Sequence, residues 1–300
     1  MEPKLQRWVQ RQGWDRAASC YERYWGDQLR PAIDLLLATA DLRPGERVLD
    51  IAAGTGAVSL QAAAAVAPSG RVLATDLSPK MLDELARRAA AGRHRNIDVA
   101  CCGAEELAVG DSFDLALCSL GLMYVPSPQA AVDAVHRAVR PGGRTVVSVW
   151  GDRRHCGWAE IFPIVDARVA SDVCPMFFAL GSVGALTALL EGAGFVDAHE
   201  TRLAVELHYA DAAEALGAAF LGGPVALAAA RFSADDRATA HAEYLASIER
   251  YADGSGYRIP GEFVVASARR ADGRITSNHN RQEQSHDDHQ HLPGRQRRQH

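Results

Sequence analysis

Two acidic residues and a pair of glycines have the spacing of a nucleoside-binding site. Asp50 lies near the end of an apolar run that leads into Gly54-Thr55-Gly56, and Asp76 ends the next apolar run, twenty residues after Gly56. Glycines allow a tight turn and a close approach of a ligand to the backbone. A carboxylate at the end of a strand can accept hydrogen bonds from both hydroxyls of a ribose. Because a carboxylate and a phosphate repel each other, the pattern favours a nucleoside that carries a cationic group.

A dinucleotide site is the first alternative, and it would make the protein a nucleotide-dependent oxidoreductase. The dinucleotide fingerprint Gly-x-Gly-x-x-Gly needs a third glycine for helix packing, but Ser59 stands at that position. S-adenosylmethionine carries a sulfonium and an ammonium group, so it suits the two acids better. Structural roles also stay open, because Asp50 could cap the following turn and Asp76 or Ser78 could cap the next helix.

Strands and helices that would position these residues alternate along the chain. Strands are predicted at 47–51, 71–75, 97–101, 113–119 and 144–150, and helices at 57–66, 79–91 and 129–140. The alternation predicts a parallel sheet with helices on both faces. Ligands of such sheets bind beyond the carboxyl ends of the strands, where Asp50 and Asp76 lie.

The patterns divide the chain into four parts. Residues 1–40 are predicted to form a helical cap, and residues 41–150 the cofactor-binding core. The alternation breaks after 150, which predicts that 151–270 holds a lid and the last strands, at 198–207 and 262–268, of the same domain. Residues 271–300 are polar and almost free of apolar side chains, so we expect a disordered tail.

Composition narrows the class of protein. The chain has 48% apolar and 23% charged residues and a net charge of −5, which argues against binding of nucleic acid. Two uncharged stretches, 173–190 and 215–230, contain Pro and Gly and fall short of a span of about 20 apolar residues, so buried helices are expected. The first residues lack a continuous apolar segment, and the six cysteines form no zinc-like cluster. We therefore expect a cytoplasmic protein with reduced thiols and no metal site.

Five stretches, in the right order, resemble the class I S-adenosylmethionine-dependent methyltransferases, in particular the branch with the ubiquinone/menaquinone-biosynthesis C-methyltransferases and small-molecule methyltransferases. They are VLDIAAGTG (48–56), ATDLSPKML (74–82), GAEEL (103–107), FDLALCSLGLMYVPSP (113–128) and RAVRPGGRTVVSVW (137–150). The resemblance implies a doubly wound, mostly parallel seven-stranded sheet of the Rossmann-like methyltransferase fold, with a helical lid insertion. It also implies S-adenosyl-L-methionine as cofactor and methyl transfer as activity.

The same resemblance assigns cofactor contacts residue by residue. It implies that the methionine end of the cofactor faces Asp50 and the backbone of Ala52, Gly54, Thr55 and Gly56. Asp76 would bind the ribose, Leu77 would pack on the adenine, and Ala104 and Glu105 would line the adenine edge. Ser119, together with Leu120, would lie under the donor methyl.

Two residues depart from the family's pattern. Gly103 stands where an acid commonly receives the adenine amino group, and Ala52 replaces a glycine found in many relatives. Glu105 or a water molecule could take over the role of the missing acid. A small residue such as Ala52 is expected to be tolerated.

The acceptor is predicted to be a small apolar or aromatic molecule. The sequence Ser119-Leu120-Gly121-Leu122 lacks the acid or Asn and the Pro-Pro-aromatic motif of many amino methyltransferases of DNA, RNA and protein. The 151–235 region is apolar and aromatic, which suits a small organic acceptor.

Aromatic residues on three segments are the candidates for the acceptor pocket: Tyr21, Trp25, Trp150 and Phe177. O- or C-methylation is favoured, and a base for it would be His155, or Tyr21 or Tyr24. Proximity without a base is another possibility, as is a cofactor-binding protein without turnover.

Overall fold

The computed structural model describes residues 2–110, 112–169 and 177–272. Its strands are β1 (Arg47–Ile51), β2 (Arg71–Asp76), β3 (Ile97–Cys101), β4 (Phe113–Ser119), β5 (Val139–Trp150), β6 (Phe195–Tyr209), β7 (Ala252–Asp253) and β8 (Gly256–Arg270). Its α-helices are α1 (Pro3–Trp25), α2 (Arg30–Ala40), α3 (Ala57–Val66), α4 (Pro79–Ala91), α5 (Pro128–Ala138), α6 (Ile161–Asp166), α7 (Ala185–Gly192), α8 (Ala212–Phe220), α9 (Ala226–Ala229) and α10 (Ala234–Ile248).

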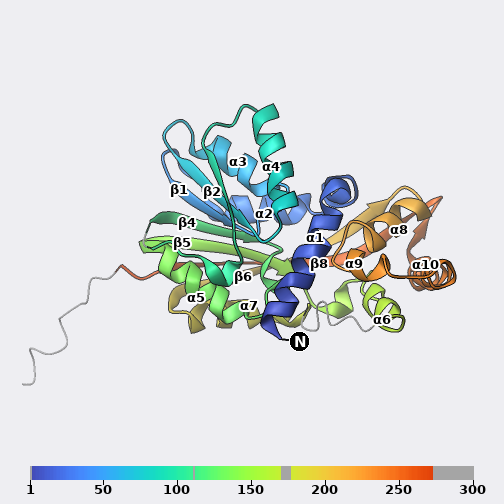
Figure 1. The fold of residues 1–300 in the computed structure, drawn as a ribbon. Helices are drawn as coiled ribbons and strands as arrows, with labels where there is room; N and C mark the ends of the chain where they lie inside the picture. The colour runs from blue at the N-terminus through green and yellow to red at the C-terminus, as the bar shows by residue number, and fades with distance from the viewer. Residues whose placement is uncertain (1, 111, 170–176, 273–300) are drawn as a thin grey trace, which may run out of the picture.

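The strands form one twisted sheet in the order β3-β2-β1-β4-β5-β8-β6, and the short β7 pairs with β8 beside this path. Strands β1 to β5 pair in parallel, whereas β8 runs antiparallel to both β5 and β6. Helices α2, α3 and α4 cover one face of the sheet and α5 and α7 the other (Figure 1). The expected fold, a doubly wound and mostly parallel sheet, is confirmed.

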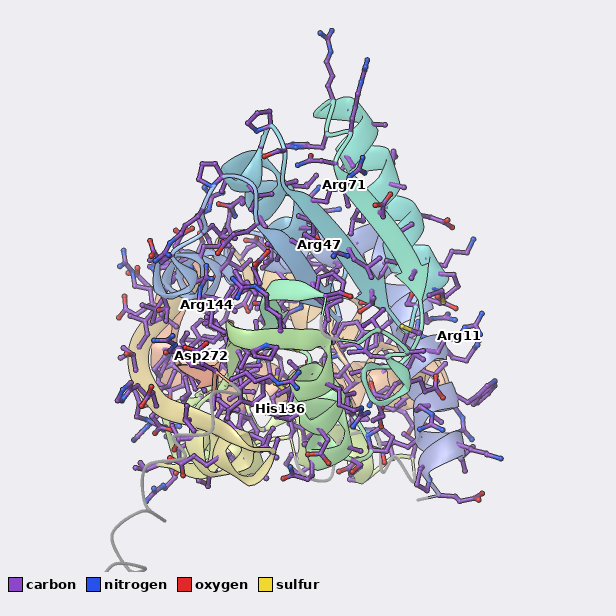
Figure 2. The ribbon with its side chains drawn as sticks, turned by 90° about the vertical axis from the view of Figure 1, so that its left-hand side faces the viewer. Arg11, Arg47, Arg71, His136, Arg144 and Asp272 are labelled. Carbon is purple, nitrogen blue, oxygen red and sulfur yellow. The ribbon has the colours of Figure 1, made fainter. Side chains whose placement is uncertain are left out.

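The two ends of the parallel strands differ in what lies beyond them. Figure 2 views the molecule from the side where Arg47 and Arg71 begin β1 and β2. At the opposite, carboxyl ends, α1 packs against α4, α8 and α9 (Figure 1). Helices α8, α9 and α10 gather on the far side of α1 from the parallel strands (Figure 1), and α8 also contacts β6 and β8. Helix α1 therefore lies between the parallel strands and this group of helices.

Several boundaries differ from the sequence prediction. The strand predicted at 144–150 begins at Val139, because the Pro141-Gly142-Gly143 turn is taken up within β5 as a bulge: Phe113 pairs with Val139, and Leu115 pairs with Arg144. Strands β6 and β8 are also longer than predicted, because they pair with each other over nearly their whole length.

The helical cap predicted at 1–40 consists of two helices with a break between Trp25 and Arg30. The lid region is described except for residues 170–176. The predicted polar tail lies outside the described residues from 273 onward.

Candidate functional site

A cavity of about 1030 Å³ of empty space, open in part to solvent, lies at the carboxyl ends of the strands. Its wall contains eleven of the residues predicted from the sequence: Tyr21, Trp25, Ala52, Gly54, Asp76, Leu77, Ala104, Glu105, Ser119, Trp150 and Phe177. A smaller adjoining cavity is lined by Asp50 and Thr55 and shares Ala52, Gly54 and Ser119 with the first. The fold thus brings together residues from α1, from the ends of β1, β2, β4 and β5, and from the lid.

The loop after β1 is held in a left-handed conformation. Ala52, Gly54 and Gly56 have φ of 53°, 55° and 89°. A Cβ on Gly56 would lie 2.6 Å from Cγ of Leu85, so both the conformation and the packing against α4 require glycine there. Ala52 adopts its positive φ without being glycine, which makes it an uncommon backbone conformation at the edge of the cavity.

Asp50 is buried, with 1% of its surface exposed, and has one protein partner. The hydroxyl of Ser59 donates a hydrogen bond to Oδ2, while Oδ1 has no hydrogen-bond partner among the described residues. The pKa of Asp50 is raised to about 7, chiefly by burial; the Ser59 hydrogen bond acts to lower it, and the neighbouring charge of Asp76 acts to raise it. A cation placed beside Oδ1 would favour the ionised form.

Asp76 accepts backbone hydrogen bonds with both of its oxygens. The N–H of Gly54 donates to Oδ2 and the N–H of Ser78 to Oδ1, each at 2.8 Å. Burial raises the pKa of Asp76 to about 6, although these N–H groups act to lower it. Ser78 is the N-cap of α4, since its hydroxyl accepts from the N–H of Met81 at 3.1 Å. The helix cap is therefore Ser78, and Asp76 faces the cavity.

Glu105 lies at the end of the cavity that the resemblance assigns to the adenine. Its Oε1 is buried without a hydrogen bond and lies 3.8 Å from Nη1 of Arg7. A Cβ on Gly103 would lie 3.3 Å from Oε2 of Glu106 and 3.4 Å from Oε2 of Glu105. An acid at position 103 would place a third carboxylate beside two others, which gives a physical reason for the departure from the family's pattern.

The other end of the cavity is aromatic. Trp150 packs against Trp158 with ring centroids 4.7 Å apart and against Trp25 at 6.1 Å. Phe177 packs against Trp158 at 5.7 Å and against Tyr124 at 5.4 Å. All five side chains line the cavity, and Trp25, Trp150, Trp158 and Phe177 are also part of the hydrophobic core. The predicted acceptor residues Trp25, Trp150 and Phe177 thus line the cavity and also belong to the hydrophobic core.

Sequence reasoning missed two aromatic residues of this wall, Trp14 and Tyr124, and assigned Trp158 only to the aromatic 151–235 region. Trp14 packs edge-on against Tyr21 at 5.9 Å and against Tyr124 at 5.0 Å, and Trp158 contacts the rings of Trp25, Trp150, Phe162, Phe177 and Phe178. Trp14 precedes Tyr21 by two helical turns, so a helical-face argument would have found it. Tyr124 lies inside a motif already singled out, but nothing in the sequence indicates where its ring points.

His155 does not belong to the described wall of either cavity. Its side chain is 56% exposed, and its Nδ1 lies 3.1 Å from Oε2 of Glu262. The sequence placed it just after β5, but Asp152–Cys156 form a short 3₁₀ turn in which Asp152 caps the N–H of Arg154, and this turn directs His155 toward β8. The structure thus places His155 outside the described lining of both cavities, and its role as the base stays a prediction. Tyr24, the other candidate on α1, lines a different cavity.

The described residues offer neither a metal-binding cluster nor a membrane-spanning helix. They contain no group of three or more His, Cys, Asp or Glu side chains arranged to hold a metal ion. Among the same residues, every helix is too short or too polar to cross a bilayer.

Comparison with known proteins agrees with this geometry. Residues 48–143 match the methyltransferase domain family. An uncharacterised protein of Mycobacterium tuberculosis is 38% identical over 123 residues, which are 41% of this chain and 43% of that protein. A ubiquinone/menaquinone biosynthesis C-methyltransferase of Cupriavidus pinatubonensis is 37% identical over 150 residues, which cover 45% of this chain and 59% of that enzyme.

Among solved structures, phosphoethanolamine N-methyltransferase 2 of Haemonchus contortus, in complex with phosphomonomethylethanolamine and S-adenosylhomocysteine, has a TM-score of 0.57 at 18% identity. The match covers 86% of this chain and 57% of that one. The chain spans about half the length of the curated relatives it matches. The expected resemblance to class I methyltransferases is confirmed, and the N-methyltransferase adds a likeness of fold alone.

Proposed function

Residues 48–143 carry a methyltransferase domain, and from this premise we propose that the protein transfers a methyl group from S-adenosylmethionine to a small aromatic or apolar molecule, at oxygen or carbon. The observation that carries the proposal is the two-ended cavity. Buried carboxylates without a cationic partner among the described residues lie at one end, and a cluster of aromatic rings lies at the other.

The acidic end fits a cationic nucleoside. Asp50 keeps one oxygen without a hydrogen bond in a buried position, which is costly unless a ligand supplies a donor or a positive charge. Asp76 is held by two backbone N–H groups at the cavity wall, with lone pairs left to receive ribose hydroxyls. Glu105 offers a further acceptor beside Arg7. S-adenosylmethionine supplies an electrophilic methyl group on a sulfonium, together with an ammonium and a ribose.

The buried Ser59 argues against the oxidoreductase alternative. The side chain of Ser59 is fully buried and donates a hydrogen bond to Asp50. The residue that replaces the third glycine of the dinucleotide fingerprint therefore orients the carboxylate of Asp50. A pyrophosphate at this helix N-terminus would face the carboxylate of Asp50. The hydrogen-bonded pair of Ser59 and Asp50 therefore favours a cationic ligand over a pyrophosphate.

The aromatic end supports a flat, apolar acceptor. Trp25, Trp150 and Phe177 offer ring faces and edges, which bind apolar and aromatic molecules by area and shape. These residues also exclude water from the acceptor, and excluding water strengthens electrostatic interactions with a transferring methyl group. One relative is named as a C-methyltransferase of ubiquinone/menaquinone biosynthesis, which supports carbon as an acceptor atom.

Positioning, with no strong base, is the contribution we assign to the protein. Neither histidine nor lysine is found among the described residues that line the cavity. Burial, followed by the charges of Glu22 and Asp76, raises the pKa of Tyr21 well above its usual range, which makes its phenol a poor proton acceptor at neutral pH. Alignment of the acceptor with the methyl group can by itself supply a large part of a rate enhancement.

The experiment is a transfer assay with S-adenosylmethionine tritiated in the methyl group. Quinols, phenols, amines and thiols are offered as separate panels, and the Asp76→Ala variant serves as the control without cofactor binding. We expect label in an aromatic product bearing a new O–CH₃ or C–CH₃ group, identified by mass spectrometry. Label only in amines or thiols would contradict the proposed acceptor class. Cofactor binding without transfer to any panel would favour a binding protein.

A further inference from the structure

A second large cavity lies on the opposite side of α1 from the proposed cofactor site. It encloses about 1320 Å³ of empty space, open in part to solvent, between α1, α8, α9 and α10 (Figure 1). Its lining residues on α1 are Arg16, Cys20 and Tyr24, whereas Gln10, Trp14 and Tyr21 of the same helix line the first cavity. None of its described lining residues belongs to the methyltransferase motifs.

The interior of this cavity is apolar. Leu216 and Phe220 come from α8, Ala229 from α9, and Phe232 from the segment that leads into α10. Phe220 and Phe232 are buried, with ring centroids 6.5 Å apart. Leu221, which also lines the cavity, is 55% exposed. An apolar body could therefore be bound here by burial against these side chains.

The charged side chains among the described lining of this cavity are basic. Arg16, Arg237 and His241 line it, and no Asp or Glu is found among its described lining residues. No carboxylate within the described ranges comes within 4.0 Å of the guanidinium of Arg16 or Arg237. This contrasts with paired arginines such as Arg144 and Arg168, which bind Glu46 and Glu243.

His241 adds evidence for a positive local field. Its ring packs on Phe220 with centroids 4.7 Å apart. Burial lowers the pKa of His241, and the charge of Arg237 lowers it further. The positive field therefore extends to a partly buried side chain inside the cavity, and it is not restricted to the exposed tips of the arginines.

From this juxtaposition we propose that the cavity between α1, α8, α9 and α10 binds an amphiphilic carboxylate, with its apolar body against Phe220 and Phe232 and its carboxylate between Arg16 and Arg237. The site is separate from the proposed cofactor cavity, because α1 stands between the two. The proposal does not depend on methyl transfer, since every residue it uses lies outside that cavity.

The test uses dodecanoate as the probe and isothermal titration calorimetry on the full chain, with saturating S-adenosylhomocysteine to fill the first cavity. We expect one dodecanoate per chain, and about tenfold weaker binding to the double variant Arg16→Ala/Arg237→Ala, because each exposed ion pair with the carboxylate contributes only modestly. The matched control Arg11→Ala/Arg250→Ala makes the same change of net charge outside the cavity and should retain the affinity within about twofold.

A second pair of measurements tests the contribution of the apolar interior to dodecanoate binding. Ala229→Trp fills the interior and should abolish dodecanoate binding, while circular dichroism confirms that the variant is folded. If that variant is unfolded, Ala229→Leu replaces it. Dodecyltrimethylammonium, with the same chain and the opposite charge, should not bind. The proposal is overturned if both double variants bind dodecanoate alike, if the ammonium amphiphile binds as well as the carboxylate, or if S-adenosylhomocysteine abolishes binding.

Discussion

Acidic side chains at the two ends of the parallel strands have opposite surroundings. Where the strands begin, Asp114 accepts from the backbone N–H of Arg47 at 2.7 Å and from Nε of Arg140 at 2.6 Å. Although partial burial acts to raise it, these donors hold the pKa of Asp114 below its usual value. Where the strands end, burial raises the pKa of Asp50 and Asp76, and neither forms an ion pair within the described part of the chain.

Glu46 and Arg144 extend the contrast. The guanidinium of Arg144 binds both oxygens of Glu46, at 2.7 and 3.0 Å, and donates to the carbonyls of Ala40 and Asp41. At the strand beginnings, therefore, charge is neutralised inside the protein and ties α2 to β5. At the strand ends, the described residues supply no cation to neutralise the carboxylates of Asp50 and Asp76. Unneutralised buried acids are expected where the fold sacrifices stability for binding.

The largest expected effect is that of Asp76→Ala on cofactor affinity. Hydrogen bonds to a charged acceptor contribute roughly 1.5–3 kcal/mol each, so the loss of two ribose contacts should weaken S-adenosylmethionine binding about a hundredfold or more. Calorimetry measures the affinity, and thermal unfolding tests whether the fold is retained. Asp114→Ala is the matched control at the other end of the sheet, and it should lower the melting temperature without weakening cofactor binding. Equal affinities in the wild type and Asp76→Ala would contradict the ribose assignment.

The second prediction concerns stability against pH in the ligand-free protein. An acid whose pKa is raised by folding stabilises the protein fully below its unfolded pKa, near 4, and loses that contribution as the pH rises through its folded value, about 7 for Asp50. Asp50→Asn should therefore raise the free energy of unfolding at pH 8 by up to about 4 kcal/mol and leave it nearly unchanged at pH 4.

The matched change at the other end of the sheet should have the opposite sign. Asp114→Asn removes a charge that its donors stabilise, so it should lower the free energy of unfolding at pH 8. Urea unfolding at both pH values measures both variants. If both variants shift stability in the same direction at pH 8, the contrast between the two ends does not hold.

The third prediction compares Phe177, which lines the cavity, with Phe178, which packs behind it. Phe177→Leu should lower turnover of the acceptor by about threefold to tenfold, because some apolar contact area is lost, while cofactor affinity stays within about twofold. Phe178→Leu is the control, because Phe178 packs on Phe177 at 4.8 Å without lining the cavity. Steady-state kinetics with the acceptor found in the transfer assay make the comparison. If the two variants lower turnover equally, Phe177 acts as core packing alone.

The smallest expected effect is at an exposed ion pair beside the strand beginnings. Arg71 and Asp98 lie 3.7 Å apart with about two-thirds of each side chain exposed, so the pair is worth at most about 1 kcal/mol. Arg71→Ala should leave cofactor affinity unchanged and shift the melting temperature by only a degree or two. Differential scanning fluorimetry with and without S-adenosylmethionine measures both. A large loss of affinity would mean that charge at the strand beginnings also acts on the site.

Local sequence patterns were enough to predict the cofactor loops. The glycines at 54 and 56, the acids at 50 and 76 and the alternation of strands and helices all act over a few residues, so their spacing carries the information. The register of β6 and β8 could not be predicted in the same way, because it depends on pairing between segments separated by some fifty residues of helices and loops.

The chain by itself determined the parallel sheet, the order of its motifs and the acids at the strand ends, because each follows from short-range periodicity and turn chemistry. Only the tertiary structure decided that these two acids lack a cationic partner among the described residues, whereas Asp114 and Glu46 at the strand beginnings are paired with arginines. It paired Ser59 with Asp50, gave the helix cap to Ser78 and turned His155 toward Glu262. It also placed α1 between two cavities. Such outcomes depend on side chains that meet across long sequence separations, and no local pattern records which of them will meet.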